Sequence, residues 1–441
     1  MNVKKHINFT SMRKDFSELL LAANQDRRQS GKIDYSINDA VMSGFACMYF
    51  QAPSIKAFQE RLQDERDMNN LTTMFGVKSI PGDSQLRNII DALGSEVLRP
   101  VFKGVVTRLQ RGKQLEQFQV FPNTYLAALD GSQYFYSQNI KCGSCLTAEH
   151  KNGTVSYSHE VLMAALMCPG IAQVIPLMPE EIRNTDGHEK QDCEVNAAKR
   201  LIPAMKKDHP RLKLIIVGDG IYSKQPMIEE VVDKEWSYIF VARPDDHAVM
   251  YRHLENVPMR QKTVVDEKNG KTHVYEWSNC VPLNGNKETV TVNYFRYKIV
   301  STDKAGNEKI TYRNYWVTDI EIGEDNIEQL VKCGRCRWKI ENECFNTLKN
   351  QGYDLEHSYG HGERNLCFNF LLLTLIAFLF HQVLELTDKL YQAVREKMGS
   401  KRRMWETLRA YIQILIFNSW EHLLDFTLDP LKYNPVFTNA P

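Results

Sequence analysis

The spacing of apolar residues changes twice along the chain, and these changes divide the chain into parts. Up to about residue 115, apolar residues recur every three or four positions in segments that Pro, Gly or polar residues separate. This spacing is typical of amphipathic helices. We predict helices over residues 12–24, 36–49, 54–66 and 83–93.

From about residue 124, short apolar runs replace the helical spacing and indicate strands. Asp130 ends the first predicted strand, and Asp219 ends the last strand of this part, which follows a helix. We predict strand-like segments over 125–130, 133–136, 153–158 and 171–177, an amphipathic helix over 190–207 and a buried strand over 212–219.

Residues 246–328 alternate between apolar and polar positions, with Asn-Gly and Ala-Gly turns between the runs, as antiparallel strands do. The chain is then helical to about residue 426. The sequence therefore predicts an α/β core with a β-strand insertion and helical parts at both ends. We divide it into a helical domain over 1–115, the first part of the core over 116–245, the insertion over 246–328 and a helical part over 329–441.

The helix that follows the insertion has an acidic side chain on its apolar face. At about 100° per residue, Glu341 shares a face with Ile340, Cys344 and Leu348, whereas Glu343 lies on the polar face. A carboxylate held against a core is costly unless a partner or a metal ion offsets the loss of solvation. Glu341 is therefore a candidate site residue.

Three carboxylates now share an unusual position, because Asp130 and Asp219 end strands and Glu341 faces inward from a helix. Mg²⁺ prefers carboxylate oxygens, and two such ions can activate an oxygen nucleophile and stabilise the leaving oxygen of a phosphodiester. Each Asp alone is more often a turn or cap residue. The prediction of a metal site depends on the three residues together.

Composition limits the partners of the chain only mildly. The 441 residues carry a net charge of +1, so any contact with DNA has to come from local basic patches. The first residues contain no apolar leader, which favours a cytoplasmic protein with reduced cysteines. The apolar run over 370–380 is shorter than a bilayer span and predicts a buried core helix, with no membrane partner.

The order of these residues resembles bacterial insertion-sequence transposases of the DDE type. The resemblance covers about 120–385 and rests on Leu-Asp130-Gly-Ser, Val-Gly-Asp219-Gly, the β insertion and Arg337-Trp-Lys-Ile-Glu341. The branch resembled has a ribonuclease-H-like core with a β-rich insertion before its Glu, and a tyrosine, arginine, glutamate, lysine signature. Here Gly334 stands at the tyrosine position, and Lys349 lies eight residues after Glu341 where the signature has seven.

The resemblance implies DNA transposition on double-stranded element ends and target DNA by a homodimer. Asp130, Asp219 and Glu341 would hold Mg²⁺ or Mn²⁺ while water attacks the element end and the freed 3′-OH attacks the target. Arg337 and Lys349 would contact phosphates. Two alternatives are a transposase-derived DNA-binding protein that no longer cuts, and a ribonuclease-H-like nuclease without strand transfer.

Two further DNA contacts follow from the sequence, each with a structural alternative. Trp316, on the strand before the helix, would stack on an unpaired base, or is a core residue. Residues 71–87 are similar to a helix-turn-helix in which Asp83 or Ser84 caps the second helix. Ser84, Gln85 and Arg87 would then reach bases or phosphates, unless this is an ordinary helical bundle.

Two pairs of cysteines have the same spacing, Cys142-Gly-Ser-Cys145 and Cys333-Gly-Arg-Cys336. Four thiolates of this type suit a structural tetrahedral Zn²⁺, which would tie the hairpin after Asp130 to the helix that carries Glu341. His150 is a spare candidate ligand. The alternatives are two unconnected reduced pairs or a redox-active pair.

Overall fold

The computed structural model describes residues 7–23, 26, 28, 33–62, 69–184, 191–286, 288–302, 308–357 and 359–433. Their helices are α1 (Phe9–Ala23), α2 (Ile37–Tyr49), α3 (Ile55–Leu62), α4 (Asp83–Ala92), α5 (Arg99–Arg111), α6 (Glu194–Asp208), α7 (Gln225–Asp233), α8 (Ala248–Glu255), α9 (Ile327–Arg335), α10 (Asn346–Asn350), α11 (Leu366–Thr387), α12 (Lys389–Met398), α13 (Lys401–Ile414) and α14 (Trp420–Leu428). Short π-helices lie over Leu71–Phe75 and Ile340–Phe345.

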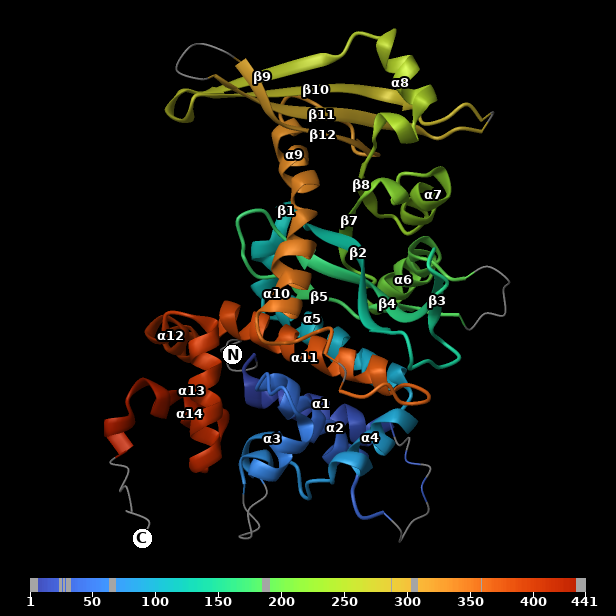
Figure 1. Cartoon of the computed structure of the whole chain (residues 1–441). Coiled ribbons are helices and arrows are strands. Elements are labelled where there is room, and N and C mark those ends of the chain that lie inside the picture. The colour runs from blue at the N-terminus through green and yellow to red at the C-terminus, as the bar shows by residue number, and fades with distance from the viewer. Residues whose placement is uncertain are drawn as a thin grey trace.

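The strands are β1 (Gln119–Phe121), β2 (Thr124–Ser137), β3 (Leu146–Glu149), β4 (Val155–Met167), β5 (Ile175–Pro176), β6 (Glu180–Ile182), β7 (Lys213–Gly218), β8 (Ser237–Val241), β9 (Arg260–Asp266), β10 (Lys271–Pro282), β11 (Thr291–Thr302) and β12 (Glu308–Thr318). They form one 12-stranded sheet with the main order β3-β4-β2-β7-β8-β12-β11-β10-β9. The fold is therefore mixed α/β, an open sheet with helical flanks (Figure 1).

The four helices predicted before residue 95 are confirmed as α1 to α4, although the predicted ends at Asn24 and Arg66 lie outside the described residues. The Ser36 side chain caps α2, because it accepts the N–H of Asp39 while the Asp39 carboxylate accepts the N–H of Ser36. The predicted cap of α4 is wrong. Gly82 occupies the N-cap position, and glycine has no side chain that could cap the helix.

The central strands have both parallel and antiparallel partners. β2 pairs antiparallel with β4 and parallel with β7, which pairs parallel with β8. The two strand segments predicted around Asp130 are one strand, β2, and only Ile175–Pro176 of the predicted 171–177 segment is a strand. α6 is the helix predicted over 190–207, whose first residue, Lys190, lies outside the described residues.

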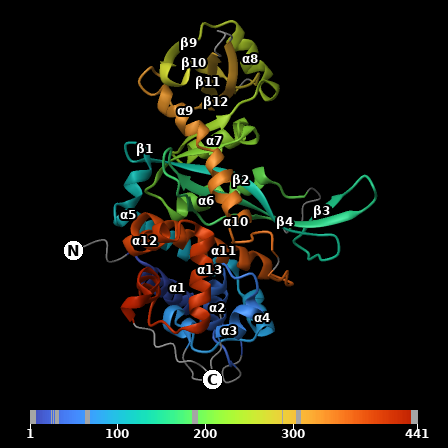
Figure 2. The ribbon, with the colours of Figure 1, turned by 60° about the vertical axis from the view of Figure 1, so that its left-hand side comes forward.

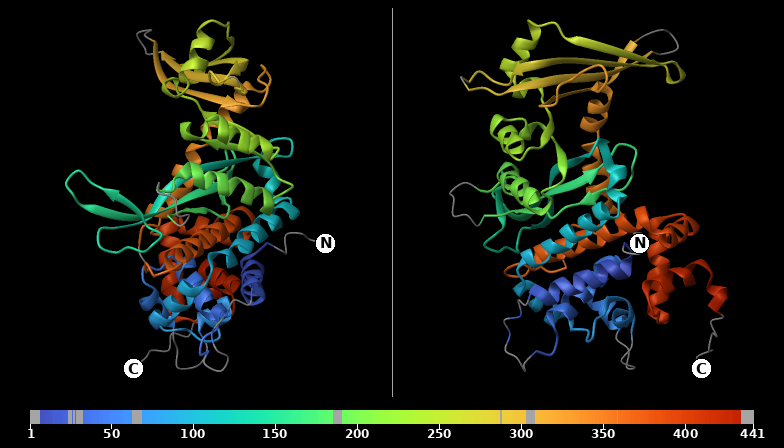
Figure 3. Two further views of the ribbon diagram at one scale, coloured as in Figure 1. Left: turned by 90° about the vertical axis from the view of Figure 1, so that its right-hand side faces the viewer. Right: turned by 180° about the vertical axis from the view of Figure 1, so that it is seen from behind.

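The predicted antiparallel insertion is confirmed as β9, β10, β11 and β12. It continues the central sheet, because β12 pairs with β8 through Trp316 opposite Val241 and the two following residue pairs. Figure 1 shows this part at the top, with α9 and α10 running from it down past the central strands. The β3–β4 hairpin projects from the side of the molecule (Figures 2 and 3).

α11 contains the apolar run that the sequence assigns to a core helix. Its length and composition are sufficient to cross a membrane, but 94% of its most apolar window is buried inside the protein. It packs against α2 and α4 of the N-terminal part. The predicted core helix is therefore confirmed, and it joins the two helical ends of the chain.

Trp316 is a core residue, which corrects the prediction that it stacks on a DNA base. Its side chain is 0% exposed and stacks on Phe295, with ring centroids 5.2 Å apart. On its other side lies Gly334 of α9, where a Cβ atom would be 2.8 Å from the indole ring. A side chain at position 334 would therefore overlap the indole ring.

Gly334→Ala is expected to lower the free energy of unfolding by about 1–3 kcal/mol, because the added methyl group overpacks the core against Trp316. The matched control is Gly104→Ala inside α5, where a Cβ would have nothing within 4 Å. That change should stabilise the protein by about 0.5–1 kcal/mol through helix propensity. Urea denaturation measures both, and a stabilising Gly334→Ala would contradict the packing described here.

Candidate active site and metal centre

Asp130 and Asp219 lie next to each other because of the register between β2 and β7. In this parallel pair Ala128 is opposite Val217, so two residues further along each chain Asp130 and Asp219 occupy corresponding positions. Neighbouring strands are about 4.8 Å apart. β7 ends at Gly218, and the Asp219 side chain accepts the N–H of Ile221 at 3.0 Å. β2 continues past Asp130 to Ser137, so the prediction that Asp130 ends its strand is wrong. The two acids nevertheless lie side by side on neighbouring strands, where β7 ends.

Arg337 links Glu341 to Asp130. One guanidinium nitrogen of Arg337 lies 3.0 Å from Oε1 of Glu341 and 3.8 Å from Oδ2 of Asp130. The neighbours of Glu341 on its helical face, Ile340 and Cys344, are buried, whereas the Glu341 side chain is 36% exposed. Glu341 is thus at the margin of the core and not inside it, and Glu343 is also partly buried. Arg337 supplies the charged partner that a carboxylate at the margin of a core requires.

The electrostatics of the site centre on Asp130. Burial raises the pKa of Asp130 to about 7; Arg337 opposes this shift, and the negative charges of Glu341, Glu194 and Asp219 add to it. A carboxyl group with this pKa is close to its titration midpoint at neutral pH. The mutual repulsion of these groups would be relieved by a cation, and Arg337 is the cation present.

Glu194 is a fourth carboxylate that the sequence analysis missed. It is the first residue of α6 and accepts a short hydrogen bond from the hydroxyl of Tyr222. It packs against Gly131, where a Cβ would lie 2.7 Å from its Oε2, and Tyr222 packs equally closely against Gly218. Burial raises the pKa of Glu194, and the charge of Asp219 contributes. In the sequence, Gly131 and Gly218 beside the two aspartates were the available signal that other side chains pack closely there.

The π-helix over Ile340–Phe345 accounts for the unusual spacing of Lys349. A π-turn holds one more residue than an α-turn, so the eighth residue after Glu341 lies about where the seventh would on an uninterrupted α-helix. The Lys349 ammonium pairs with Glu356 at 2.8 Å.

The residues predicted to read DNA from α4 differ in accessibility. Ser84 and Gln85 are exposed at the start of α4, after the π-helix and a left-handed turn at Gly76. The guanidinium of Arg87 instead bonds to Asp83 at 2.7 Å and to the carbonyl of Tyr359 at 2.8 Å. Arg87 therefore joins α4 to the loop before α11.

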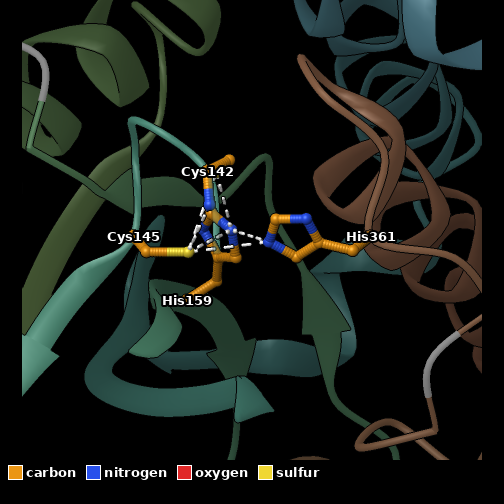
Figure 4. A group of neighbouring side chains, drawn as sticks. All are labelled: Cys142, Cys145, His159 and His361. Atoms are coloured by element: carbon orange, nitrogen blue, oxygen red, sulfur yellow. Dashed lines mark hydrogen bonds between the residues drawn. The ribbon is translucent and has the colours of Figure 1, made fainter. Parts of the chain in front are cut away.

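The structure does not bring the four cysteines of the predicted zinc site together. The described residues contain one group of three or more potential ligand atoms that all lie within 4.8 Å of one another, and it consists of Cys142, Cys145, His159 and His361 (Figure 4). His150, the spare candidate, bonds to Ser156 at 2.8 Å.

Cys333 and Cys336 are buried at the end of α9 beside other groups. Burial raises the pKa of both thiols, to about 12 for Cys336, and the nearby charged groups are Lys339 and the thiol of Cys168. The two cysteine pairs are therefore not brought together. In the group that does form, burial raises the pKa of Cys142, but hydrogen bonds with His159 and His361 more than offset this and lower it to about 5.

No protein-family model matches this chain, and no curated protein matches it either. The residues and their geometry are therefore the basis for inferring its function.

The pKa of about 7 for Asp130 predicts a dependence of stability on pH. An acid whose pKa is higher in the folded state stabilises the fold while it is protonated, and this contribution is lost as the pH rises from about 4 through about 7. Asp130→Asn cannot ionise, so its stability relative to wild type should increase between pH 5 and pH 8, by on the order of 1–3 kcal/mol.

Urea denaturation at the two pH values, without divalent cations, measures this difference. Glu343→Gln, on the same helix as Glu341, is the control and should track wild type. A difference between Asp130→Asn and wild type that is constant with pH, or that shrinks as the pH rises, would contradict a raised pKa at Asp130.

Proposed function

We propose that the chain is a DDE-type DNA transposase with a ribonuclease-H-like core, which cleaves element ends and joins the 3′-OH to target DNA. The observation that carries the proposal is the convergence of three acids from distant parts of the sequence. Asp130, within β2, and Asp219, directly after β7, occupy corresponding positions on neighbouring strands, and Arg337 lies within 4 Å of both Asp130 and Glu341.

The order of the central elements supports a ribonuclease-H-like core. The antiparallel strands β2 and β4, with β5 and β6 on β4, come first; α6 then leads to β7, parallel to β2, and α7 leads to β8, parallel to β7. The insertion follows β8 in the chain, and its last strand, β12, pairs with β8. It therefore precedes the helix with Glu341, as in the branch that the sequence resembles.

The residues present fit a hard divalent cation. Asp130, Asp219 and Glu341 offer only carboxylate oxygens, which Mg²⁺ and Mn²⁺ prefer, and Glu194 adds a fourth. Bound there, two cations would activate the attacking oxygen and stabilise the leaving oxygen of a phosphodiester. Arg337 now lies between two of these carboxylates, 3.0 Å from Glu341 and 3.8 Å from Asp130.

Basic and aromatic groups beside the acids suit a DNA strand. Arg337 can form paired hydrogen bonds to a phosphate, and Lys349 offers a point charge from the same helical segment. Trp338 is 49% exposed, with the Arg337 guanidinium 4.9 Å from its ring centroid. We assign to Trp338 the stacking on an unpaired base that the sequence analysis gave to Trp316.

In the proposed reaction, water attacks the phosphorus at the element end, and the bond from phosphorus to the 3′ oxygen breaks. The released 3′-OH then attacks a phosphorus of the target, which transfers the element strand and frees a target 3′-OH.

Asp219→Asn and Glu341→Gln are expected to lower Mg²⁺-dependent nicking of a labelled duplex by on the order of a thousandfold, because each removes an oxygen ligand. The duplex carries the inverted repeat from the DNA that flanks the reading frame. Glu343→Gln, two residues from Glu341 on the polar face, should nick at the wild-type rate. DNA binding by all variants is measured separately and should be retained.

Three outcomes separate the proposal from its alternatives. Nicking followed by joined products supports a transposase, whereas cleavage without joined products indicates a ribonuclease-H-like nuclease. Binding without cleavage by the wild type indicates a DNA-binding protein that no longer cuts. Equal loss of nicking in Glu341→Gln and Glu343→Gln would contradict the choice of Glu341.

Glu194→Gln is expected to raise the Mg²⁺ concentration for half-maximal nicking by about tenfold, because it removes a negative charge beside Asp130 and Asp219. Tyr222→Phe keeps the charge and removes only the hydrogen bond that orients it, so its effect should be smaller. A Mg²⁺ titration of both variants measures this. If the Mg²⁺ concentration for half-maximal nicking is the same in Glu194→Gln and the wild type, Glu194 is not part of the site.

A further inference from the structure

The cluster of Cys142, Cys145, His159 and His361 has the dimensions of an occupied metal site. Its sulfurs are 3.7 Å apart, its imidazole Nε2 atoms are 3.1 Å apart, and sulfur–nitrogen distances are 3.4–3.5 Å. A tetrahedral Zn²⁺ with sulfur at about 2.3 Å and nitrogen at about 2.0–2.1 Å requires edges of about 3.8, 3.3 and 3.6 Å in the same order. All four ligand atoms face one point (Figure 4).

We propose that Cys142, Cys145, His159 and His361 bind one structural Zn²⁺, and that this ion fixes the loop before α11 between the sheet and α4. Two thiolates and two imidazoles in a tetrahedron are the ligand set that Zn²⁺ prefers. Four protein ligands fill the coordination sphere, so the ion has no open position for catalysis. The inference does not depend on the transposase proposal.

Neighbouring groups orient the side chains of the proposed ligands. Nδ1 of His361 lies 2.9 Å from the carbonyl of Gly362, a hydrogen bond that leaves its Nε2 free to bind a metal. Nδ1 of His159 lies 3.6 Å from Glu181, whose carboxylate also accepts the hydroxyl of Tyr134 at 2.8 Å. The backbone N–H of Cys142 donates a hydrogen bond to the sulfur of Cys145 at 3.4 Å, which orients that sulfur.

The four ligands come from segments that are far apart in the sequence. Cys142 and Cys145 lie between β2 and β3, and His159 lies on β4. His361 is more than 200 residues away, in the loop before α11. One ion bound by all four ligands would therefore link segments that are distant in the sequence. It would tie the base of the projecting hairpin to the loop before α11.

The same loop is bound to α4 on its other side. The Asp91 carboxylate of α4 accepts the backbone N–H groups of residues 363–366 at 2.9–3.2 Å. Arg87 of α4 donates to the carbonyl of Tyr359. The exposed residues Ser84 and Gln85 are on this helix. Zinc would therefore hold the surface that they form in a fixed position relative to the sheet.

Metal analysis of the purified full chain should find about one zinc per chain. Cys145→Ser and His361→Ala should lose it, whereas Cys333→Ser with Cys336→Ser should retain it, because those thiols are outside the cluster. Zinc near zero in the wild type, or equal zinc in His361→Ala and the wild type, would overturn the proposal.

A second measurement does not require a folded variant. The wild-type chain, stripped of zinc and loaded with Co²⁺, should show the strong visible bands of a tetrahedral ion and charge-transfer bands of two thiolates. Weak octahedral bands would overturn the ligand set. Hydrogen exchange before and after chelation should show faster exchange in residues 359–366 and in α4, with β10 and β11 unchanged; no change in the loop would overturn its anchoring.

Discussion

The repulsion between carboxylates that the sheet holds close together is the constraint on which the site depends. The register of β2 with β7 puts Asp130 and Asp219 at corresponding positions on neighbouring strands, and the start of α6 adds Glu194. Burial and these neighbours raise the pKa of Asp130 to about 7. One guanidinium, that of Arg337, offsets the charge. Such an arrangement is poor for stability and well suited to a site that receives cations.

Close packing at glycines allows the surrounding chain to support these acids. Glu194 rests on Gly131, Tyr222 rests on Gly218, and Trp316 rests on Gly334. At each position a side chain would enter the space of a neighbour that positions the site. The insertion contributes to the same support, because Trp316 belongs to β12 and packs against Gly334 of α9, two residues before the turn that holds Arg337.

Local signals in the sequence were sufficient for most of the elements, and they singled out Asp130, Asp219 and Glu341, whose role as metal ligands is the proposal made above. Helical spacing identified the face of Glu341, and alternation identified the insertion. Long-range contacts were not predictable in this way. Nothing near His159 or His361 marks them as partners of Cys142 and Cys145, and the repeated cysteine spacing instead suggested Cys333 and Cys336. The burial of Trp316 likewise depends on Phe295 and Gly334, which only the fold brings to it.

Anomalous diffraction from crystals of the chain grown with Mn²⁺ and an element-end duplex tests the central claim most directly. The account predicts a manganese peak coordinated by Asp130, Asp219 and Glu341, with Arg337 moved from between Asp130 and Glu341 to a DNA phosphate. An ordered complex with no peak at these carboxylates, and with Arg337 still bound to Asp130 and Glu341, would contradict it.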